Sequence, residues 1–225
     1  MSFKTDSFVL RSRPWTTADR LYDLFTPYEG VIRVLLKSGQ KAGNKLSGQM
    51  LPFSKVRVMI GRGRMDHLAG ADTIKDFPRI RQNLHLIFLA SSVAELLINE
   101  TSQSDKAPEF QMLDQIFGQL DDPSINLAQK IILTRIFLWK YLSLAGWQPR
   151  FGQGIIYMSG HTDKGQEISD NLQDFIKYII QTDLDACCHI KIGQRLNQEW
   201  LKLSQNYYQT VYDFPSKALK LFNYA

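Results

Sequence analysis

Arginines and lysines recur at regular positions in two short stretches, residues 30–37 (GVIRVLLK) and 55–64 (KVRVMIGRGR). Alternate side chains of a β-strand point to opposite faces. Arg33 and Lys37 would therefore share one face with Val31 and Leu35, while Ile32, Val34 and Leu36 share the other. Arg57 has the same relation to its apolar neighbours. Each stretch is thus predicted to be a strand that buries one face and presents cations from the opposite face.

The loop between these stretches, residues 38–53, adds Lys41 and Lys45. A single cationic strand face is explained by solvation alone, but two such faces joined by a cationic loop favour the binding of a polyanion. Cations that neutralise phosphates, together with aromatic rings on which bases stack, hold single-stranded nucleic acids without reading their sequence. The candidate nucleic-acid contacts are Arg11, Arg13, Arg33, Lys37, Lys41, Lys45, Arg57, Arg62 and Arg64.

Four aromatic residues lie near these cations in the sequence: Trp15, Tyr22, Tyr28 and Phe53. Each ring is a candidate for base stacking. Each could instead fill the core or close the end of a barrel, and both explanations stay open at this stage.

Residue patterns for catalysis or metal binding are much weaker. The histidines are scattered, and no Cys-x-x-Cys or His-x-x-x-His spacing supplies a first pair of metal ligands. The segment Gly61–Arg64 lacks the Lys-Ser/Thr of a phosphate-binding loop and is predicted to be a turn. Cys187, Cys188 and His189 could form a soft-metal cluster, although small buried thiols explain them as well. We expect no enzyme, no metal and no cofactor.

The two cysteines are adjacent, which excludes a disulfide framework and is typical of a reducing compartment. The first residues lack an apolar segment of signal-peptide length. The most apolar helical candidate, residues 131–144, is interrupted by Arg135 and Lys140 and is too short to span a bilayer. A soluble cytoplasmic protein is expected.

The elements that must position the cations follow from periodicity. Alternating patterns predict five short strands before residue 77, with glycines at the corners. Such a set suits a small closed barrel of the OB type, with an SH3-like barrel as the alternative. After Pro78 the period becomes helical, with Ile80, Leu84, Ile87 or Phe88, and Leu97 predicted to share a buried stripe. The predicted class is α+β: a barrel domain over residues 1–78 and an all-α domain over residues 79–225.

Charge is divided unequally between these parts. Residues 1–81 contain 15 Lys/Arg and 7 Asp/Glu, whereas residues 82–225 contain 12 and 15. The first part therefore has a net charge of about +8, and the second about −3. This asymmetry favours a polyanion partner for the barrel.

Several motifs together resemble the RecO family of bacterial recombination mediators. Within the first 75 residues these are VLRSRPW (9–15), DLFT (23–26), Gly30 with Arg33 and Lys37, Leu46 with Gly48, Pro52 and Phe53, and GRG (61–63). Ser38 and Arg64 depart from the usual glycine and acidic residue of the family. Further along, the similarity rests on Glu95–Leu97, Arg135 with Phe137, Gly146–Trp147, and Ser216–Lys217 with Phe222.

The resemblance implies an OB domain followed by a helical domain, without catalysis. It implies binding of single- and double-stranded DNA, annealing of complementary strands, and loading of recombinase (RecA) onto DNA coated by single-stranded-DNA-binding protein, often with RecR. Many family members carry a four-cysteine zinc module after the central helix. Residues 148–167 contain no cysteine, so no zinc is expected here.

The resemblance also implies a docking site on the helical domain for the C-terminal tail of single-stranded-DNA-binding protein. A tail that ends in a carboxylate needs an apolar pocket with cations at its rim. Lys130 and Arg135 are the candidates, and an internal salt bridge of Arg135 to Glu95 or Asp114 is the alternative. Two other functions stay open: an RNA-binding barrel, and a nuclease, for which no carboxylate or histidine cluster is found.

Overall fold

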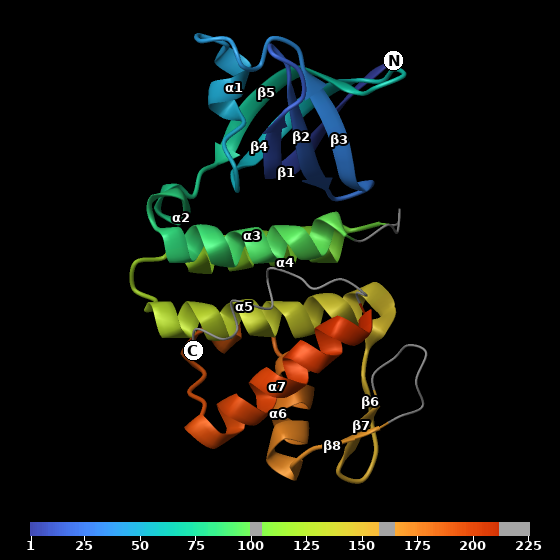
Figure 1. Cartoon of the computed structure of the whole chain (residues 1–225), viewed down its shortest axis with the longest axis vertical. Coiled ribbons are helices and arrows are strands. Elements are labelled where there is room, and N and C mark those ends of the chain that lie inside the picture. The colour runs from blue at the N-terminus through green and yellow to red at the C-terminus, as the bar shows by residue number, and fades with distance from the viewer. Residues whose placement is uncertain (100–104, 158–164, 212–225) are drawn as a thin grey trace. The chain divides into compact units, whose positions relative to one another are not determined.

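In the computed structural model, residues 1–99, 105–157 and 165–211 are described. The chain forms two compact units, Met1–Asp121 and Asp122–Ala225 (Figure 1). Each unit is described by itself.

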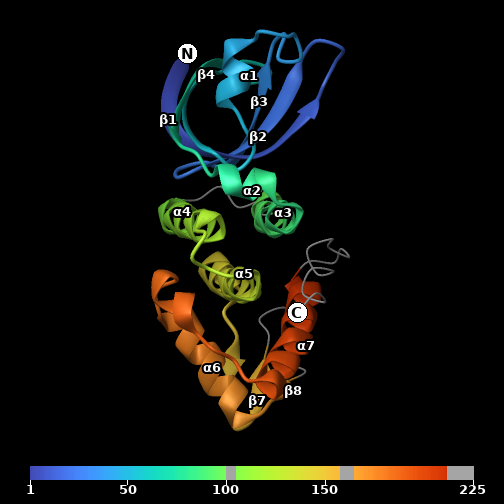
Figure 2. The same cartoon turned by 90° about the vertical axis from the view of Figure 1, so that its left-hand side faces the viewer.

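The first unit contains a closed five-stranded barrel. Its strands are β1 (Ser2–Pro14), β2 (Arg20–Thr26), β3 (Gly30–Leu36), β4 (Lys55–Gly61) and β5 (His67–Lys75). They are hydrogen-bonded in the order β1-β2-β3-β5-β4, and Figure 2 shows them curving around the core. All neighbouring pairs are antiparallel except β3 and β5, which meet in parallel at Leu35 and His67. This is an OB-like barrel, and the predicted fold class is confirmed.

The alternation predicted for the two cationic strands is also confirmed. Ile32, Val34 and Leu36 of β3 point into the barrel core with alternate residues of β4, whereas Arg33 and Arg57 are exposed on the outside. At the β4–β5 corner a Cβ on Gly61 would lie 2.4 Å from the His67 ring, so a larger residue there would require the His67 side chain to move.

A short helix between β3 and β4, α1 (Lys45–Gln49), was not predicted. Asn44 caps it by accepting hydrogen bonds from the backbone N–H groups of Leu46 and Ser47. Five residues are too few to show a helical period, which is why the sequence pattern missed it. Leu46 packs on the barrel core beside the buried Met50.

Three helices complete the first unit: α2 (Pro78–Gln82), α3 (Leu84–Ile98) and α4 (Ala107–Asp121). Phe110 of α4 stacks on the barrel, with its ring centroid 4.8 Å from that of Phe8 and 6.2 Å from that of Phe25. The compact unit that holds the barrel therefore continues past Pro78 to the end of α4.

The buried stripe predicted after Pro78 was partly wrong. Ile80 and Leu97 are buried and Ile87 is partly buried, but Leu84 and Phe88 are 76% and 36% exposed. Asn83 ends α2 and caps α3, so the two helices do not share one continuous phase. The buried face of α3 is formed instead by Leu86, Leu89, Ala90, Val93, Ala94, Leu96 and Leu97.

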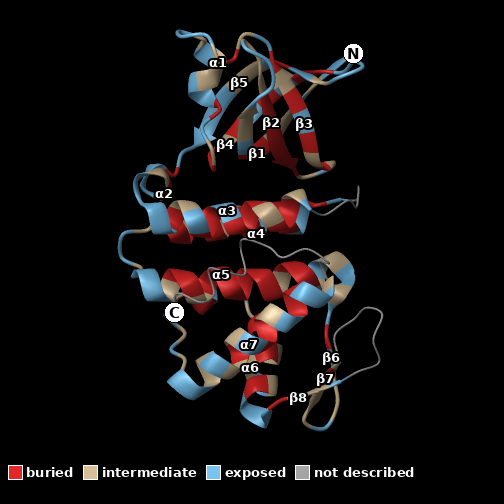
Figure 3. Cartoon of the chain, viewed as in Figure 1, coloured by how far each residue is buried: buried red, intermediate tan, exposed pale blue. Residues whose placement is uncertain are grey.

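The second unit is built around α5 (Leu127–Leu142), which is buried along most of its length (Figure 3). This agrees with its apolar sequence. A π-helical turn, η1 (Ser143–Trp147), follows, and Gly146 adopts a φ of 90° there. The helices α6 (Asp170–Gln181) and α7 (Gln194–Val211) complete the helical part, with a 3-10 turn, η2 (Asp185–His189), between them.

A small antiparallel sheet lies between α5 and α6, in the order β6 (Arg150–Phe151), β7 (Ile155–Tyr157) and β8 (Gln166–Glu167). The second unit is therefore helical but not all-α. The sequence pattern also predicts a helix that ends near Thr101, a short strand that ends at Met158 before a turn at Ser159–Gly160, and a helix that ends at Tyr212. These ends and the turn lie outside the described residues, as do the motif residues Ser216, Lys217 and Phe222.

None of the helices in residues 1–99, 105–157 and 165–211 combines the length and apolar character that crossing a bilayer requires.

Candidate nucleic-acid interface

Three of the candidate arginines converge on one carboxylate on the outer face of the barrel. Asp23 Oδ2 accepts hydrogen bonds from Arg11 Nε at 2.8 Å and from Arg13 Nη1 at 3.3 Å. Asp23 Oδ1 accepts one from Arg33 Nε at 3.0 Å. Asp23 itself is only 2% exposed, because the three guanidinium groups cover it. We call these four residues the arginine cluster.

Strand register explains why the cluster forms. Asp23 on the central strand β2 is paired with Arg11 on β1 and with Arg33 on β3, so the three side chains lie in one row across the sheet. Cross-strand neighbours of opposite charge stabilise such a row. Arg13, two residues further along β1, reaches the same carboxylate diagonally.

The cluster keeps cationic groups available to a ligand. The side chains of Arg11, Arg13 and Arg33 remain 47%, 34% and 58% exposed. A guanidinium has five N–H donors, and Arg33 directs only Nε to Asp23. Three positive charges against one negative charge leave a net charge of about +2 on the face, held in fixed positions. Such a face can bind phosphates.

Two further candidate arginines are engaged in ion pairs. Arg57 on β4 donates to Asp6 on β1 from Nε at 2.8 Å and from Nη2 at 3.3 Å, and this hydrogen bonding raises the pKa of Arg57. Arg62 pairs with Glu29 and Asp66, and hydrogen bonding to Glu29 raises the pKa of its guanidinium. Their charge is thus partly compensated, which the sequence did not indicate.

The remaining candidate cations lie at the barrel rim, with Lys37, Lys41 and Arg64 in loops and Lys45 at the start of α1. Lys37, Lys41, Lys45 and Arg64 are exposed, and none forms an ion pair within the described part of the chain. The loop that carries Lys37 and Lys41 is tied to the β1–β2 loop, because the Gln40 backbone N–H donates to the Ala18 carbonyl at 2.8 Å. These cations extend the basic surface beyond the arginine cluster.

The four aromatic candidates divide into two groups. Tyr22 and Phe53 are buried, at 1% and 5% exposure, and therefore belong to the core. Trp15 in the β1–β2 loop is 51% exposed, and Tyr28 in the β2–β3 turn is 72% exposed. Only the latter two have a ring that a base could reach in this structure.

The two candidate residues for partner binding lie inside the second unit. Lys130 and Arg135, both on α5, are 5% and 0% exposed. Arg135 donates from Nη1 to Asn197 Oδ1 at 2.8 Å, and its guanidinium lies 4.6 Å from the Trp200 ring centroid. Burial lowers the pKa of Arg135 to about 10. It therefore stays protonated at neutral pH, and its role in docking a partner stays a prediction.

The other predicted cluster, at the cysteines, shows the features of a packed turn. Cys187 is buried, its Sγ donates to the Asp183 carbonyl at 3.3 Å, and burial raises the pKa of the thiol. Cys188 is partly buried, with its pKa also raised by burial. Within the described residues, no three His, Cys, Asp or Glu side chains are grouped as metal ligands.

Sequence reasoning missed the organising role of Asp23. The signal was present: a single acidic residue stands among apolar residues in a strand flanked by two strands that carry arginines. The role of Asp23 could be recognised only once the strand register was known, because residues 11, 23 and 33 become neighbours through strand pairing. Lys55, at the start of the cationic stretch 55–64, does not add to the basic surface, because its Nζ pairs with Asp114 Oδ2 on α4 at 2.6 Å.

Comparison with known proteins gives matches over nearly the whole chain. The model for "Recombination protein O N terminal" matches residues 1–77, and that for "Recombination protein O C terminal" matches residues 81–220. The DNA repair protein RecO of Dehalococcoides mccartyi is 29% identical over 220 residues, covering 88% of this chain and 85% of its own. Proteins of the same name from Desulfatibacillum aliphaticivorans and Pelotomaculum thermopropionicum are 28% and 30% identical. They cover 72% and 65% of this chain, and 64% and 56% of their own length.

Proposed function

Because the chain belongs to the RecO family, we propose that it is a DNA repair protein that acts by binding DNA on its OB-like barrel. The observation that carries this proposal is the arginine cluster, in which Asp23 holds three guanidinium groups in a row across β1, β2 and β3. Phosphate contacts of this kind supply affinity without reading sequence. A protein that must act on any broken DNA needs binding of that type.

The mechanism follows from charge. Two complementary strands repel each other, and a surface that neutralises the phosphates of both lowers this barrier to pairing. The arginine cluster and the rim cations Lys37, Lys41, Lys45 and Arg64 provide separate places for two backbones. We therefore expect annealing of complementary strands, with no bond made or broken by the protein. Arg57 and Arg62 would join the phosphate-binding surface once phosphate groups replace their carboxylate partners.

The cellular setting is part of the same proposal. The protein would work in the cytoplasm on single- and double-stranded DNA, together with single-stranded-DNA-binding protein and with RecR and RecA. Docking of the tail of single-stranded-DNA-binding protein is assigned to the second unit, where Lys130 and Arg135 lie on the buried α5. Because both side chains are covered, such docking requires local opening or contact through their neighbours.

The experiment is annealing of complementary DNA strands coated with single-stranded-DNA-binding protein, with and without this protein. The expected result is a faster appearance of duplex that depends on the arginine cluster. Equal rates with and without the protein would contradict the proposal. Complementary RNA strands provide the comparison for an RNA-binding barrel, and clear acceleration of RNA pairing alone would favour that alternative. Strand cleavage with added divalent metal would indicate a nuclease.

A further inference from the structure

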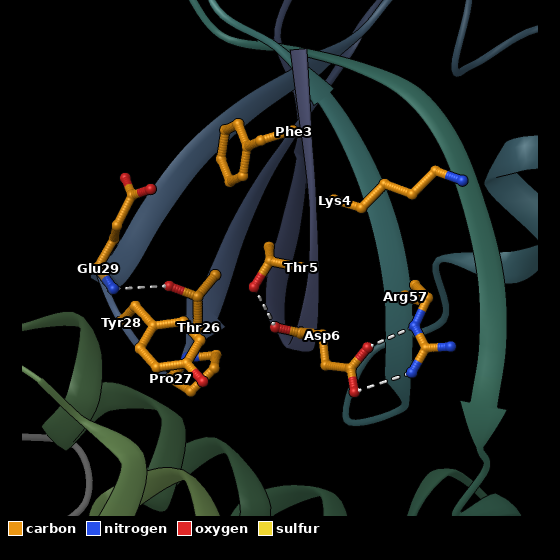
Figure 4. A pocket seen from close by; sticks show the side chains of 9 residues that line it. All are labelled: Phe3, Lys4, Thr5, Asp6, Thr26, Pro27, Tyr28, Glu29 and Arg57. Carbon is orange, nitrogen blue, oxygen red and sulfur yellow. Dashed lines mark hydrogen bonds and ion pairs between the residues drawn. The ribbon is translucent and has the colours of Figure 1, made fainter.

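A pocket of about 340 Å³ lies on the barrel between the first half of β1 and the β2–β3 turn. In Figure 4, Phe3 and Tyr28 stand at opposite ends of this pocket, with Thr5 and Glu29 on either side between them. Lys4, Asp6 and Arg57 lie on the other side of β1. This volume is at the lower end of the range for small-molecule sites, so the pocket suits one compact group.

The walls of the pocket offer aromatic rings. Tyr28 is 72% exposed, so its ring is open to a ligand. The Phe3 ring is already covered on one side, because the Arg62 guanidinium lies 4.3 Å from its centroid. A planar ligand can therefore stack on Tyr28 while Phe3 closes the far end of the pocket.

The lining carries no net charge. Lys4 and Arg57 balance Asp6 and Glu29, and the two carboxylates are held by Arg57 and Arg62. A phosphate gains little from such a lining, whereas a neutral planar group with polar edges fits it. On the Tyr28 side of β1, the Thr5 hydroxyl and the Glu29 carboxylate can pair with donors and acceptors on such edges. Such a lining suits a nucleobase better than an anion.

The location of the pocket connects it to the arginine cluster. Thr26 lines the pocket and Asp23 holds the cluster, three residues earlier on the same strand β2. Three residues of a strand span about 10 Å. A DNA strand whose phosphates lie on the arginine cluster can thus place a base at the pocket.

We propose that this pocket takes one unstacked base of a DNA single strand, with Tyr28 as the stacking platform. This inference rests on the proposed function. It predicts that the barrel prefers single strands to duplex, because the bases of a duplex are paired and stacked inside and cannot enter. Recognition through a ring face is tolerant of base identity.

The test is the affinity of the full chain for a short DNA single strand and for the matched duplex, with Tyr28→Ala, Tyr28→Phe and Tyr178→Ala. Tyr178 is an exposed tyrosine on α6 and serves as the matched control. Tyr28→Ala should raise the Kd for the single strand about tenfold, leave the Kd for duplex unchanged, and leave the salt dependence unchanged. Tyr28→Phe, which keeps the ring, and Tyr178→Ala should bind as the wild type does.

The outcomes separate this inference from the proposed function. If the wild-type chain binds single strands and Tyr28→Ala binds them equally well, the pocket assignment fails and the proposed function stands. An equal loss on single strand and duplex also overturns the assignment. If the wild-type chain binds no DNA, both fail. A deoxynucleoside monophosphate that competes at micromolar concentration would show that the pocket serves a free nucleotide, which contradicts its assignment to a strand.

Discussion

Arg33 on β3 donates from Nε to Oδ1 of Asp23 on β2 at 3.0 Å, across the centre of the outer barrel face. The carboxylate is buried and the guanidinium is more than half exposed. Asp23 therefore fixes the positions of the arginines by accepting hydrogen bonds beneath them, next to the sheet. The N–H groups that face solvent remain available to a ligand. This pair, with Arg11 and Arg13, converts three flexible cations into a surface of fixed geometry.

Replacing Asp23 by asparagine should weaken the first unit. Three guanidinium groups would lose their shared counter-charge, and we expect the free energy of unfolding to fall by about 1–2 kcal/mol, since the arginines are partly solvated. Urea unfolding measures this change. Asp72→Asn is the matched control, because Asp72 is an exposed aspartate on β5 of the same barrel. If Asp23→Asn were no less stable than Asp72→Asn, the cluster would have no structural role.

The same two variants separate positioning from charge in DNA binding. Each raises the net charge of the barrel by one, so simple electrostatics predicts equally tighter binding for both. If Asp23 positions the arginines, Asp23→Asn should bind DNA more weakly than Asp72→Asn at the same salt concentration. Equal affinities would show that only the number of cations matters.

Asp114 should make the first unit sensitive to acid. Burial raises its pKa, but hydrogen bonds from Lys55 and Lys75 outweigh this and leave the pKa below the ordinary 3.8. The charged form is thus stabilised in the folded state, and this stability is present above about pH 4 and lost as pH falls further. Asp114→Asn should lower the free energy of unfolding by about 1–2 kcal/mol at pH 7. Its difference from the wild type should shrink at pH values below the ordinary pKa. A difference that stayed constant with pH would contradict this.

Arg135 should be important for the stability of the second unit. Its side chain is fully buried against Trp200 and Asn197, so Arg135→Ala leaves a cavity and an unpaired amide. We expect a loss of about 3 kcal/mol in the free energy of unfolding. A test of partner binding must therefore include a fold control, such as the circular dichroism spectrum of the same sample. A variant as stable as the wild type would show that the buried guanidinium contributes little.

Zinc should not be required for folding. Residues 148–167 lack cysteine, and the buried Cys187 makes an internal hydrogen bond. Treatment with a chelator should leave the Tm unchanged, and elemental analysis should find no stoichiometric metal. A tightly held zinc ion, or a fall in Tm with the chelator, would contradict this expectation.

The barrel was predictable because local alternation determines which strand face is buried. The ion pairs were not, since residues such as Arg33 and Asp23 meet only through strand register. The prediction that Leu84 is buried was wrong because Asn83 ends one helix and caps the next. The hydrophobic period before Asn83 therefore does not continue after it. The surroundings of Arg135 were not predictable either, because a lone cation in an apolar helix gives no sign of its hydrogen-bond partner; its role in docking a protein partner stays a prediction. Asn197 lies 62 residues away and becomes its neighbour only when α7 packs on α5.

The most direct test of the central claim, that the barrel binds DNA through its cations, is the salt dependence of single-strand binding. If about six phosphates are neutralised, log affinity should fall with log salt concentration at a slope of about −4. The triple variant Arg33→Ala, Lys37→Ala, Arg57→Ala keeps Arg11 and Arg13 on Asp23, so the fold should remain intact. Its slope should be shallower by about 2, because three contacts are lost. The control Lys191→Ala, Arg195→Ala, Lys202→Ala removes the same charge from exposed positions of the second unit and should keep the wild-type slope. Equal slopes for the two variants would contradict the account.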